Sequence, residues 1–390
     1  MNSGKVHLSM NEDANPHKLR VGIVGGADIS AVGFAHKSAL ALLDGVEVTT
    51  GCFSRNSKVN RRSGEFWGLG SGGIKDSASR VFEDPNVDLC IILTPTPSHE
   101  NHIDLAIAAS MPFVSEKSLT TDASSTRRLM EDTKSKHLFA RVIQNYTGFP
   151  MIREMAAIVR SPEFGVLRSA RLRMLQDSYI RVPRSGVFSP PQAWRQEDFD
   201  IPTLYLDLGV HLIGVFEFVS GLTLRPLATL NGSHGRVPDI IDYTTSIGTA
   251  GQGATVSLTF GKTTPGRQND MVIELESDDL ALEWSLSNPD TIQIGQLDGS
   301  RQSIFRGLSD NKVASEIRYQ RFKAGHPTGF VEGLANYYQD VFLEFLSSKG
   351  QKTLMELQGT PQRTFDLYDS SRHMDTLATM KSQSVQESPH

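Results

Sequence analysis

Short apolar runs of strand length alternate with helix-like stretches through the first part of the chain. An Ala- and Leu-rich stretch follows the first run, and a helical pattern from about residue 98 to 109 follows the third. This alternation is typical of parallel strands joined by crossover helices. It predicts an α/β, doubly wound parallel sheet with strands at residues 19–24, 46–53, 87–93, 111–117 and 138–143.

The pattern changes after about residue 150. A helical stretch at 151–160 precedes long β-rich segments without regular helices between them, at residues 166–175, 240–248, 254–261 and 271–276. These segments predict an α+β domain on a large, mostly antiparallel open sheet. We expect one face of the sheet to bear the site and the other face, apolar and otherwise exposed, to contact a second subunit.

Composition excludes several classes of protein. The 390 residues are 38% hydrophobic and 21% charged, and the formal net charge of −5 provides no broad positive field for nucleic acid or an anionic membrane. No apolar run approaches the length of a membrane span. Cys52 and Cys90 each lie in an apolar run, which argues against a disulfide framework or a metal site and favours a reducing, cytoplasmic location.

Glycines follow the first predicted strand. In the turn Gly25-Gly26-Ala27-Asp28-Ile29-Ser30, Ala27 and Ser30 stand where a G-x-G-x-x-G turn has its second and third glycines. Glycine lets the backbone approach a pyrophosphate, and the helix N-terminus behind the turn offers it amide groups. The alternative is a plain strand-to-helix turn. The strand context favours dinucleotide binding, with contacts at Gly25, Gly26, Ala27, Asp28 and Ile29.

The end of the second strand bears on the choice of cofactor. An acidic residue there would bind the adenosine ribose of NAD, but this chain has Ser54 and Arg55, with Lys58 close behind. A guanidinium and a hydroxyl suit a 2′-phosphate, so NADP is slightly favoured over NAD. If Arg55 instead stacks on adenine, NAD is equally suitable.

Three polar residues supply candidate chemistry. Lys117 closes the strand at 111–117, at the sheet edge where α/β proteins bind ligands. Asp207 and His211 are four residues apart and share one face if the segment is helical. A neutral imidazole can accept a hydroxyl proton, a carboxylate can orient it or hold a substrate hydroxyl, and an ammonium can stabilise alkoxide charge. These groups suit the oxidation of a secondary alcohol, although each pair alone is more often a solvated pair.

These residues resemble the Glu-Lys-Pro and Asp-x-x-x-His signatures of the glucose-fructose oxidoreductase, inositol dehydrogenase and MocA (Gfo/Idh/MocA) family, and the resemblance spans roughly residues 19–380. Members are mostly NAD(P)-dependent dehydrogenases of sugars and cyclitols. By this resemblance His211 is the general acid/base, supported by Lys117 and Asp207. It implies further cofactor contacts at Thr94, Pro95, Thr96, His99, Glu116, Lys117 and Asn145, and substrate contacts at Lys117, Tyr146, Trp194, Arg195, Asp207, His211 and His326.

Two departures from the family pattern stand near the expected site. Ser118 replaces the proline of Glu-Lys-Pro, which we expect to loosen the turn that aims Lys117, and Thr147 stands where many relatives carry Arg. His326 lies in a His-Pro segment that reaches the substrate in a subset of the family, but it is equally compatible with an incidental residue in a turn that enters a helix.

The sequence therefore divides into a flexible arm at 1–17, a dinucleotide-binding Rossmann domain at 18–148 and an α+β substrate-binding and oligomerisation domain at 149–390. We expect a homodimer or homotetramer, a Pro-rich loop at 182–191 that can cover the site, and a mobile polar tail at 381–390. Two other functions stay open: an NAD-dependent glycosidase using transient oxidation and elimination, and a non-catalytic dinucleotide-sensing regulator. The retained Lys117, Asp207 and His211 count against the regulator.

Overall fold

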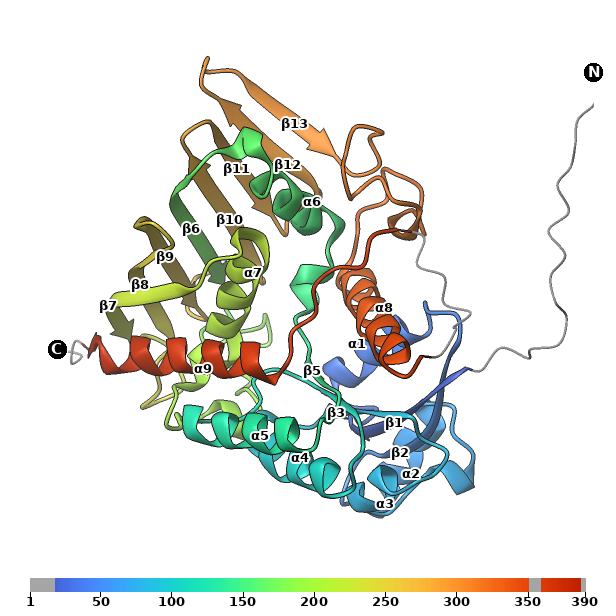
Figure 1. Ribbon diagram of the computed structural model, residues 1–390. Coiled ribbons are helices and arrows are strands. Elements are labelled where there is room, and N and C mark those ends of the chain that lie inside the picture. Colours follow the sequence, from blue (N-terminus) through green and yellow to red (C-terminus); the bar gives the residue numbers. More distant parts are fainter. Residues whose placement is uncertain (1–17, 351–358, 387–390) are drawn as a thin grey trace, which may run out of the picture.

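Two β-sheets with helices packed on them make up the protein, shown as a computed structural model in Figure 1. The structure describes residues 18–350 and 359–386. The predicted arm at residues 1–17 lies outside the described residues, as does the end of the predicted tail at 387–390. Residues 384–386 of that tail form a strand, so the expectation of a mobile tail from residue 381 is wrong for this part.

The first sheet has five parallel strands in the order β2-β1-β3-β4-β5. This order, with strands added on both sides of β1 and β3, confirms the predicted doubly wound sheet. Its strands are β1 (Leu19–Gly25), β2 (Val46–Cys52), β3 (Leu89–Leu93), β4 (Phe113–Ser115) and β5 (Ala140–Val142), and its helices are α1 (Ala31–Leu40), α2 (Ser57–Phe66), α3 (Ala78–Phe82), α4 (His99–Ala108) and α5 (Ala123–Ser135).

Alternate side chains of β3 enter two different cores. Cys90 and Ile92 pack in a core with residues of α3, α4 and α5, whereas Leu89 and Ile91 belong to a larger core that continues into the second half of the chain. Successive residues of a strand point to opposite faces, so an apolar run can fill both. Helix α8 (Phe330–Ser348), from the far end of the sequence, packs against α1 on the larger core.

The second sheet has nine strands in the order β13-β12-β11-β10-β6-β9-β8-β7-β14. Only the β6/β9 and β7/β14 pairs are parallel, which confirms the predicted mostly antiparallel sheet. Its strands are β6 (Leu167–Leu175), β7 (Leu224–Gly232), β8 (Tyr243–Ala250), β9 (Ala254–Gly261), β10 (Asp270–Ser277), β11 (Leu280–Ser285), β12 (Asn288–Gln296), β13 (Arg301–Phe305) and β14 (Ser384–Gln386).

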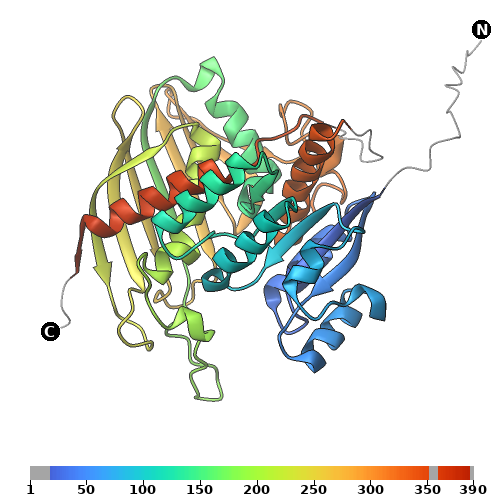
Figure 2. The ribbon, with the colours of Figure 1, turned by 60° about the horizontal axis from the view of Figure 1, so that its bottom comes forward.

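Helices cover one face of this sheet and leave the other open (Figures 1 and 2). The covering helices are α6 (Pro150–Val159), α7 (Val210–Ser220) and α9 (Leu367–Ser382). The open face is apolar only near the β7 edge, where Leu230 and Ile247 are 60% and 50% exposed. Over β6 and β10 it carries paired charges such as Arg171 with Glu274. The expectation of an apolar face therefore holds only for the β7, β8 and β14 region.

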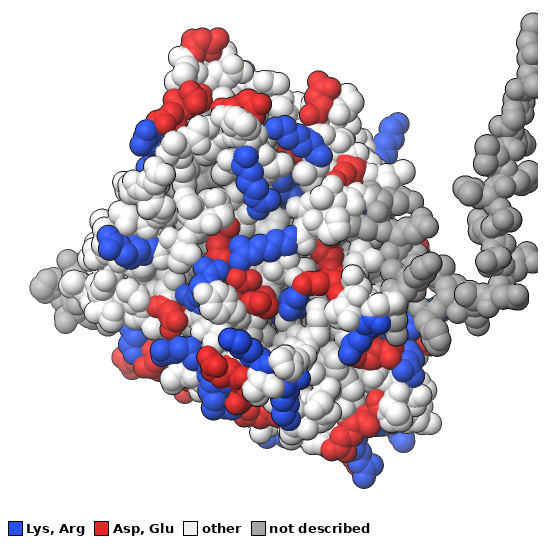
Figure 3. All heavy atoms as spheres, in the orientation of Figure 1, with Lys and Arg blue, Asp and Glu red and all other residues white. Residues whose placement is uncertain are grey.

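Among the described residues, no helix combines the length and the hydrophobicity that a bilayer crossing requires. On the face shown in Figure 3, lysine and arginine side chains are interspersed with aspartate and glutamate. Cys52 and Cys90 are free thiols, and Cys90 is buried.

A buried carboxylate joins α7 to α9 and to the chain segment before α9. Glu217, on α7, lies 3.1 Å from the His373 ring nitrogen and accepts a hydrogen bond of 2.7 Å from Arg363 and another from Arg372. Burial alone would raise the pKa of the Glu217 carboxyl, but His373 and the two guanidinium groups lower it to about 2. The charged carboxylate therefore stabilises the packing of α9 on α7.

We predict that Glu217→Gln lowers the free energy of unfolding by about 2–3 kcal/mol at pH 7, because His373 loses its carboxylate and the two guanidinium groups keep Asp369 but lose the more deeply buried carboxylate. The folded-state pKa of Glu217 lies below the ordinary 4.5, so its contribution is complete above that pH and is lost as the pH falls toward 2. Urea unfolding at several pH values should show the gap between wild type and variant closing below pH 4.5. The matched control is Glu163→Gln, at a 71% exposed side chain, and an equal loss there would contradict the prediction.

Candidate active site

A cavity of about 910 Å³ opens where the carboxyl ends of the parallel strands face the helix-covered side of the second sheet. Turns after β1 and β3 form one wall. Residues of β6, α7 and the segment at 191–195, with Lys262 after β9, form the other, which Lys117 and Tyr146 join from the turns after β4 and β5 through their contacts with Asp207 and His211. Fifteen of the residues expected from the sequence line it: Gly25, Gly26, Ala27, Ile29, Thr94, Pro95, Thr96, Glu116, Lys117, Asn145, Tyr146, Trp194, Arg195, Asp207 and His211.

The turn after β1 requires glycine. Gly25 and Gly26 have φ values of +87° and +66°, and a Cβ on Gly25 would lie 2.7 Å from the backbone of Leu93. A Cβ on Gly33 would lie 2.4 Å from the carbonyl oxygen of Gly26. Ser30, at the third glycine position, instead accepts a hydrogen bond from the Gly33 amide and caps α1. The N-terminus of α1 thus lies at the cavity wall, behind a backbone without Cβ atoms, which fits the pyrophosphate of a dinucleotide.

Several predicted cofactor contacts do not line the cavity. The carboxylate of Asp28 is turned toward α2, where it accepts hydrogen bonds from Arg62 and Ser63. The His99 ring is buried, with its nitrogens 2.7 Å from the Ser118 carbonyl oxygen and 2.6 Å from that of Thr94. His99 therefore connects the turn after β3 to the turn after β4 from the interior of the protein. Ser54, Arg55 and Lys58 lie outside the cavity, at the carboxyl end of β2, where Arg55 and Lys58 are exposed.

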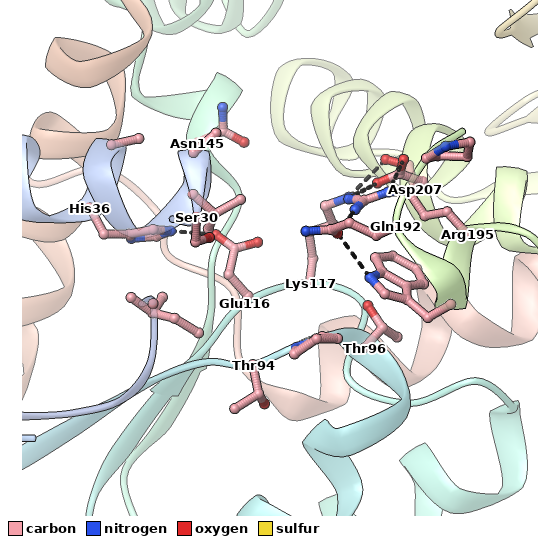
Figure 4. A pocket seen from close by; sticks show the side chains of 18 of the residues that line it. Ser30, His36, Thr94, Thr96, Glu116, Lys117, Asn145, Gln192, Arg195 and Asp207 are labelled. Carbon is pink, nitrogen blue, oxygen red and sulfur yellow. Dashed lines mark hydrogen bonds and ion pairs between the residues drawn. The ribbon is translucent and has the colours of Figure 1, made fainter. Parts of the chain in front are cut away.

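Glu116 and His36 lie together on the α1 side of the cavity (Figure 4). The His36 ring is buried and bridges Glu116, at 2.9 Å, to the hydroxyl of Tyr338 on α8, at 2.6 Å. Burial alone would raise the pKa of the Glu116 carboxyl, but the His36 contact and the Lys117 charge bring it below its ordinary value. Asn145, nearby, has a buried side-chain nitrogen without a hydrogen-bond partner among the described residues. A cofactor amide is a suitable partner for such a group.

Asp207 lies at the centre of a cluster of cations on the opposite side of the cavity (Figure 4). It belongs to the π-helical turn Tyr205–Gly209, immediately before α7. Lys117 donates to its carbonyl oxygen at 2.7 Å and to Oδ1 at 3.2 Å, and Arg195 donates to both carboxylate oxygens at 3.1 and 3.2 Å. Lys262 donates to Oδ2. Burial alone would raise the pKa of the Asp207 carboxyl, but the three cations hold it well below its ordinary value.

His211 is not paired with Asp207, as the four-residue spacing had suggested. Its Nδ1 is buried without a hydrogen-bond partner among the described residues, and its ring packs edge-on against Tyr146, with 4.9 Å between ring centroids. Burial, and then the charge of Lys117, lower the pKa of His211 well below 6.5. Burial also raises the pKa of Tyr146 to about 12. At neutral pH the imidazole is therefore uncharged and can accept a proton, whereas the phenol keeps its own.

The turn that aims Lys117 is held without the family's proline. The peptide bond between Lys117 and Ser118 is cis. Ser118 is buried, its hydroxyl donates to the carbonyl oxygen of Leu206 at 3.1 Å, and its own carbonyl lies against His99. These contacts tie the turn to the segment that carries Asp207, and so take the place of the stiffness that a proline ring supplies.

One predicted substrate contact lies away from the cavity, and several lining residues were missed. His326 is exposed, with its ring 3.1 Å from the carbonyl oxygen of Lys323, and it does not line the cavity, which favours the incidental turn residue. Lys262 directly follows the apolar strand at 254–261, the same signal that identified Lys117, but the sequence does not show toward which end of the second sheet the site lies. The other missed polar residues are Gln176, Tyr179, Gln192 and Asn269.

Comparisons with known proteins agree with this geometry. Residues 19–144 match the model of an oxidoreductase family with an NAD-binding Rossmann fold. Over 263 residues the chain is 28% identical to dTDP-3,4-didehydro-2,6-dideoxy-alpha-D-glucose 3-reductase of Actinomadura kijaniata, covering 65% of this chain and 71% of that protein. Over 145 residues it is 26% identical to trans-1,2-dihydrobenzene-1,2-diol dehydrogenase of Sus scrofa, covering 37% and 40% of the two chains.

A solved structure shows the same fold along almost the whole chain. It is an inositol dehydrogenase homologue from Azotobacter vinelandii, complexed with NADH and myo-inositol. It superposes with a TM-score of 0.81 at 20% sequence identity and covers 94% of this chain and 95% of its own. At this identity the likeness shows the fold.

The Asp207 cluster predicts unequal effects of two substitutions on stability. Asp207→Asn leaves three cations facing one another and should lower the free energy of unfolding by about 3–5 kcal/mol. Lys262→Met keeps the carboxylate bound to Lys117 and Arg195 and should change stability by no more than about 1 kcal/mol, because burying an ammonium is itself costly. Urea unfolding measures both, with Asp200→Asn at an exposed ion pair as the control. Equal losses from the two substitutions would contradict this account of the cluster.

Proposed function

We propose that the chain is a member of the Gfo/Idh/MocA oxidoreductase family, whose Rossmann-fold model matches residues 19–144, and that it transfers hydride between a nicotinamide dinucleotide and a secondary hydroxyl or ketone of a sugar, glycoside or cyclitol. One observation carries the proposal. An uncharged His211, whose Nδ1 has no hydrogen-bond partner in the part of the chain that the structure describes, shares a cavity with the Lys117 ammonium and with a glycine turn that fits a pyrophosphate. A proton acceptor, a cation and a dinucleotide cradle are the groups that alcohol oxidation requires.

The cofactor would lie across the carboxyl ends of the parallel strands. Gly25, Gly26 and the N-terminus of α1 would hold its pyrophosphate, and the residues at 94–96, with Asn145, would hold the half that carries the nicotinamide. Hydride transfer is the chemistry that this group supplies when it is bound. Arg55 and Lys58, exposed at the end of β2, are free to meet a 2′-phosphate, which is why we favour NADP slightly over NAD.

The side chains of the second wall would handle the substrate. His211 accepts the hydroxyl proton during oxidation and returns it during reduction, and Lys117 stabilises negative charge on the reacting oxygen. Asp207 does not orient His211 but holds Lys117 in place through two hydrogen bonds. Tyr146, Trp194 and Arg195 complete this wall and suit a polyhydroxylated ring, to which they offer aromatic surface and hydrogen-bond donors.

We further propose that two copies of the chain associate through the open face of the second sheet, and that the protein works in the cytoplasm. The apolar part of that face consists of Leu227, Leu230, Ile247 and Val385, each at least half exposed in the single chain. Apolar patches of this kind commonly mark contacts between subunits. Two unpaired cysteines are compatible with a reducing compartment.

Replacing His211 tests the proposed reaction. A panel of sugars and cyclitols with NAD and NADP should identify a substrate through absorbance of the reduced dinucleotide. His211→Asn should then lower turnover about 10²–10⁴-fold with little change in dinucleotide affinity, because it removes the proton acceptor alone. Lys117→Met should act similarly, and the double variant should lose less than the sum, since both act on one oxygen. His137→Asn, at an exposed residue with a φ of 49° that asparagine tolerates, is the control.

Three results would contradict the proposed reaction. Near-normal turnover by His211→Asn would remove His211 as the base. Turnover of aryl glycosides without net formation of reduced dinucleotide would favour the glycosidase. Absence of calorimetric heat and of any thermal shift with all four dinucleotides would refute cofactor binding.

The assembly proposal predicts that Leu230→Glu converts the oligomer to a monomer, because it places a carboxylate in the centre of the apolar patch. Light scattering at micromolar concentration measures the change. Val187→Glu, at a side chain that is 71% exposed outside the sheet, should leave the assembly intact. A monomeric wild-type protein would overturn the proposal.

A further inference from the structure

Positive charge exceeds negative charge on the substrate side of the cavity. Lys117, Arg195 and Lys262 bring three positive charges to the single carboxylate of Asp207, which leaves an excess of two. The other carboxylate of the cavity wall, Glu116, is bound to His36 and also faces the charge of Lys117, so Lys262 and Arg195 carry the excess (Figure 4). His211, the remaining titratable group beside Lys117, is uncharged.

The Asp207 carboxylate cannot accept a further hydrogen bond from a ligand, whereas the cations around it still have donors available. Both oxygens of Asp207 already accept two hydrogen bonds each. An ammonium carries three donors, and Asp207 is the sole hydrogen-bond acceptor of the Lys262 ammonium among the described residues. Lys262 is 3% exposed, lies over the ring of Tyr179 and borders the cavity. Buried donors without acceptors are costly unless a ligand supplies the acceptor.

Neither the cofactor nor the proposed hydride transfer accounts for this excess of positive charge. The pyrophosphate site lies at the N-terminus of α1, on the other wall of the cavity, and Lys117 is sufficient to stabilise the reacting oxygen. An oxidised nicotinamide adds a further positive charge to the same space. A neutral polyol would leave Lys262 and Arg195 to share the single carboxylate of Asp207 with Lys117, without a second anion.

We propose that the physiological substrate is an acidic sugar or polyol whose carboxylate or phosphate group binds to Lys262 and Arg195, a refinement that rests on the proposed oxidoreductase function. The planar Arg195 fork and the Lys262 ammonium present donors that suit either anion. Gln176, Tyr179 and Asn269, which line the same wall, remain available for neutral hydroxyls. Lys262 and Arg195 thus determine specificity, while Lys117 and His211 serve the reaction.

The test compares acidic and neutral members of matched pairs. Titration calorimetry on the protein saturated with reduced dinucleotide would use D-glucuronate against D-glucuronamide, D-galacturonate against D-galactose, and glucose 6-phosphate against glucose. At least one acid should bind about 10- to 100-fold more tightly than its neutral partner, the size of a charge-assisted contact. The pair with the largest difference in affinity shows whether the site prefers a carboxylate or a phosphate.

Substitution identifies the residues responsible. Lys262→Met should reduce the advantage of the acid at least about tenfold and leave the affinity of the neutral partner within about threefold. Arg168→Gln removes one positive charge at a side chain that is 60% exposed near the start of β6, and it should change neither affinity. Raising the salt concentration should weaken binding of the acid more than that of its neutral partner.

Different results would refute the proposed anion site and the proposed oxidoreductase function. Neutral partners that bind as tightly as the acids in every pair, or acids that do not bind at millimolar concentration, would refute the anion site. Burial lowers the pKa of Lys262, so a Lys262→Met variant that loses turnover of neutral substrates and one limb of the pH profile would make Lys262 a proton carrier instead. Lack of dinucleotide binding, with acids still bound to the dinucleotide-free protein, would refute the function alone.

Discussion

The contact between the Asp207 carboxylate and three cations organises the whole site. Lys117 reaches it from the end of β4 in the parallel sheet, Lys262 from the end of β9 in the nine-stranded sheet, and Arg195 from the segment between them. The carboxylate therefore joins side chains from both sheets at the place where these sheets form a common cavity. Its pKa lies well below the ordinary value, so the carboxylate is charged at neutral pH and the contact is an ion pair.

Burial and neighbouring charge together set the protonation of the other groups. His211 is uncharged because the cavity wall excludes water from it and because Lys117 repels a second positive charge. Tyr146 stays protonated because its burial raises the pKa of the phenol. The wall consequently presents one proton acceptor among several donors, a distribution that suits withdrawal of a proton from a hydroxyl while the oxygen remains bound.

The larger core explains why the cavity has a fixed shape. Residues Leu89 and Ile91 of β3 pack in the same core as Leu172 of β6 and Phe216 of α7, so the parallel sheet and the second sheet share apolar contacts directly beneath the site. Helix α8 extends this contact across α1. Because packed interiors are nearly incompressible, the two walls of the cavity keep their spacing without help from a ligand.

The sequence alone determined the class of fold, because strand-length apolar runs separated by helices leave few topologies. It also pointed to the family whose model matches residues 19–144, because Glu116-Lys117 and Asp207-His211 occur in that family's order. It also identified fifteen residues of the cavity wall, since turns at the carboxyl ends of parallel strands must lie at one edge. Only the tertiary structure decided which groups pair. Asp207 binds Lys262, which is 55 positions away in the sequence, and does not bind His211, which is one helical turn away. The reason is that the fold places three cations closer to the Asp207 carboxylate than it places the His211 imidazole. The tertiary structure likewise directs the side chains of Asp28 and His99 toward other residues of the protein and leaves His326 exposed. The direction of a side chain depends on its packing against distant parts of the chain, which the local sequence does not specify.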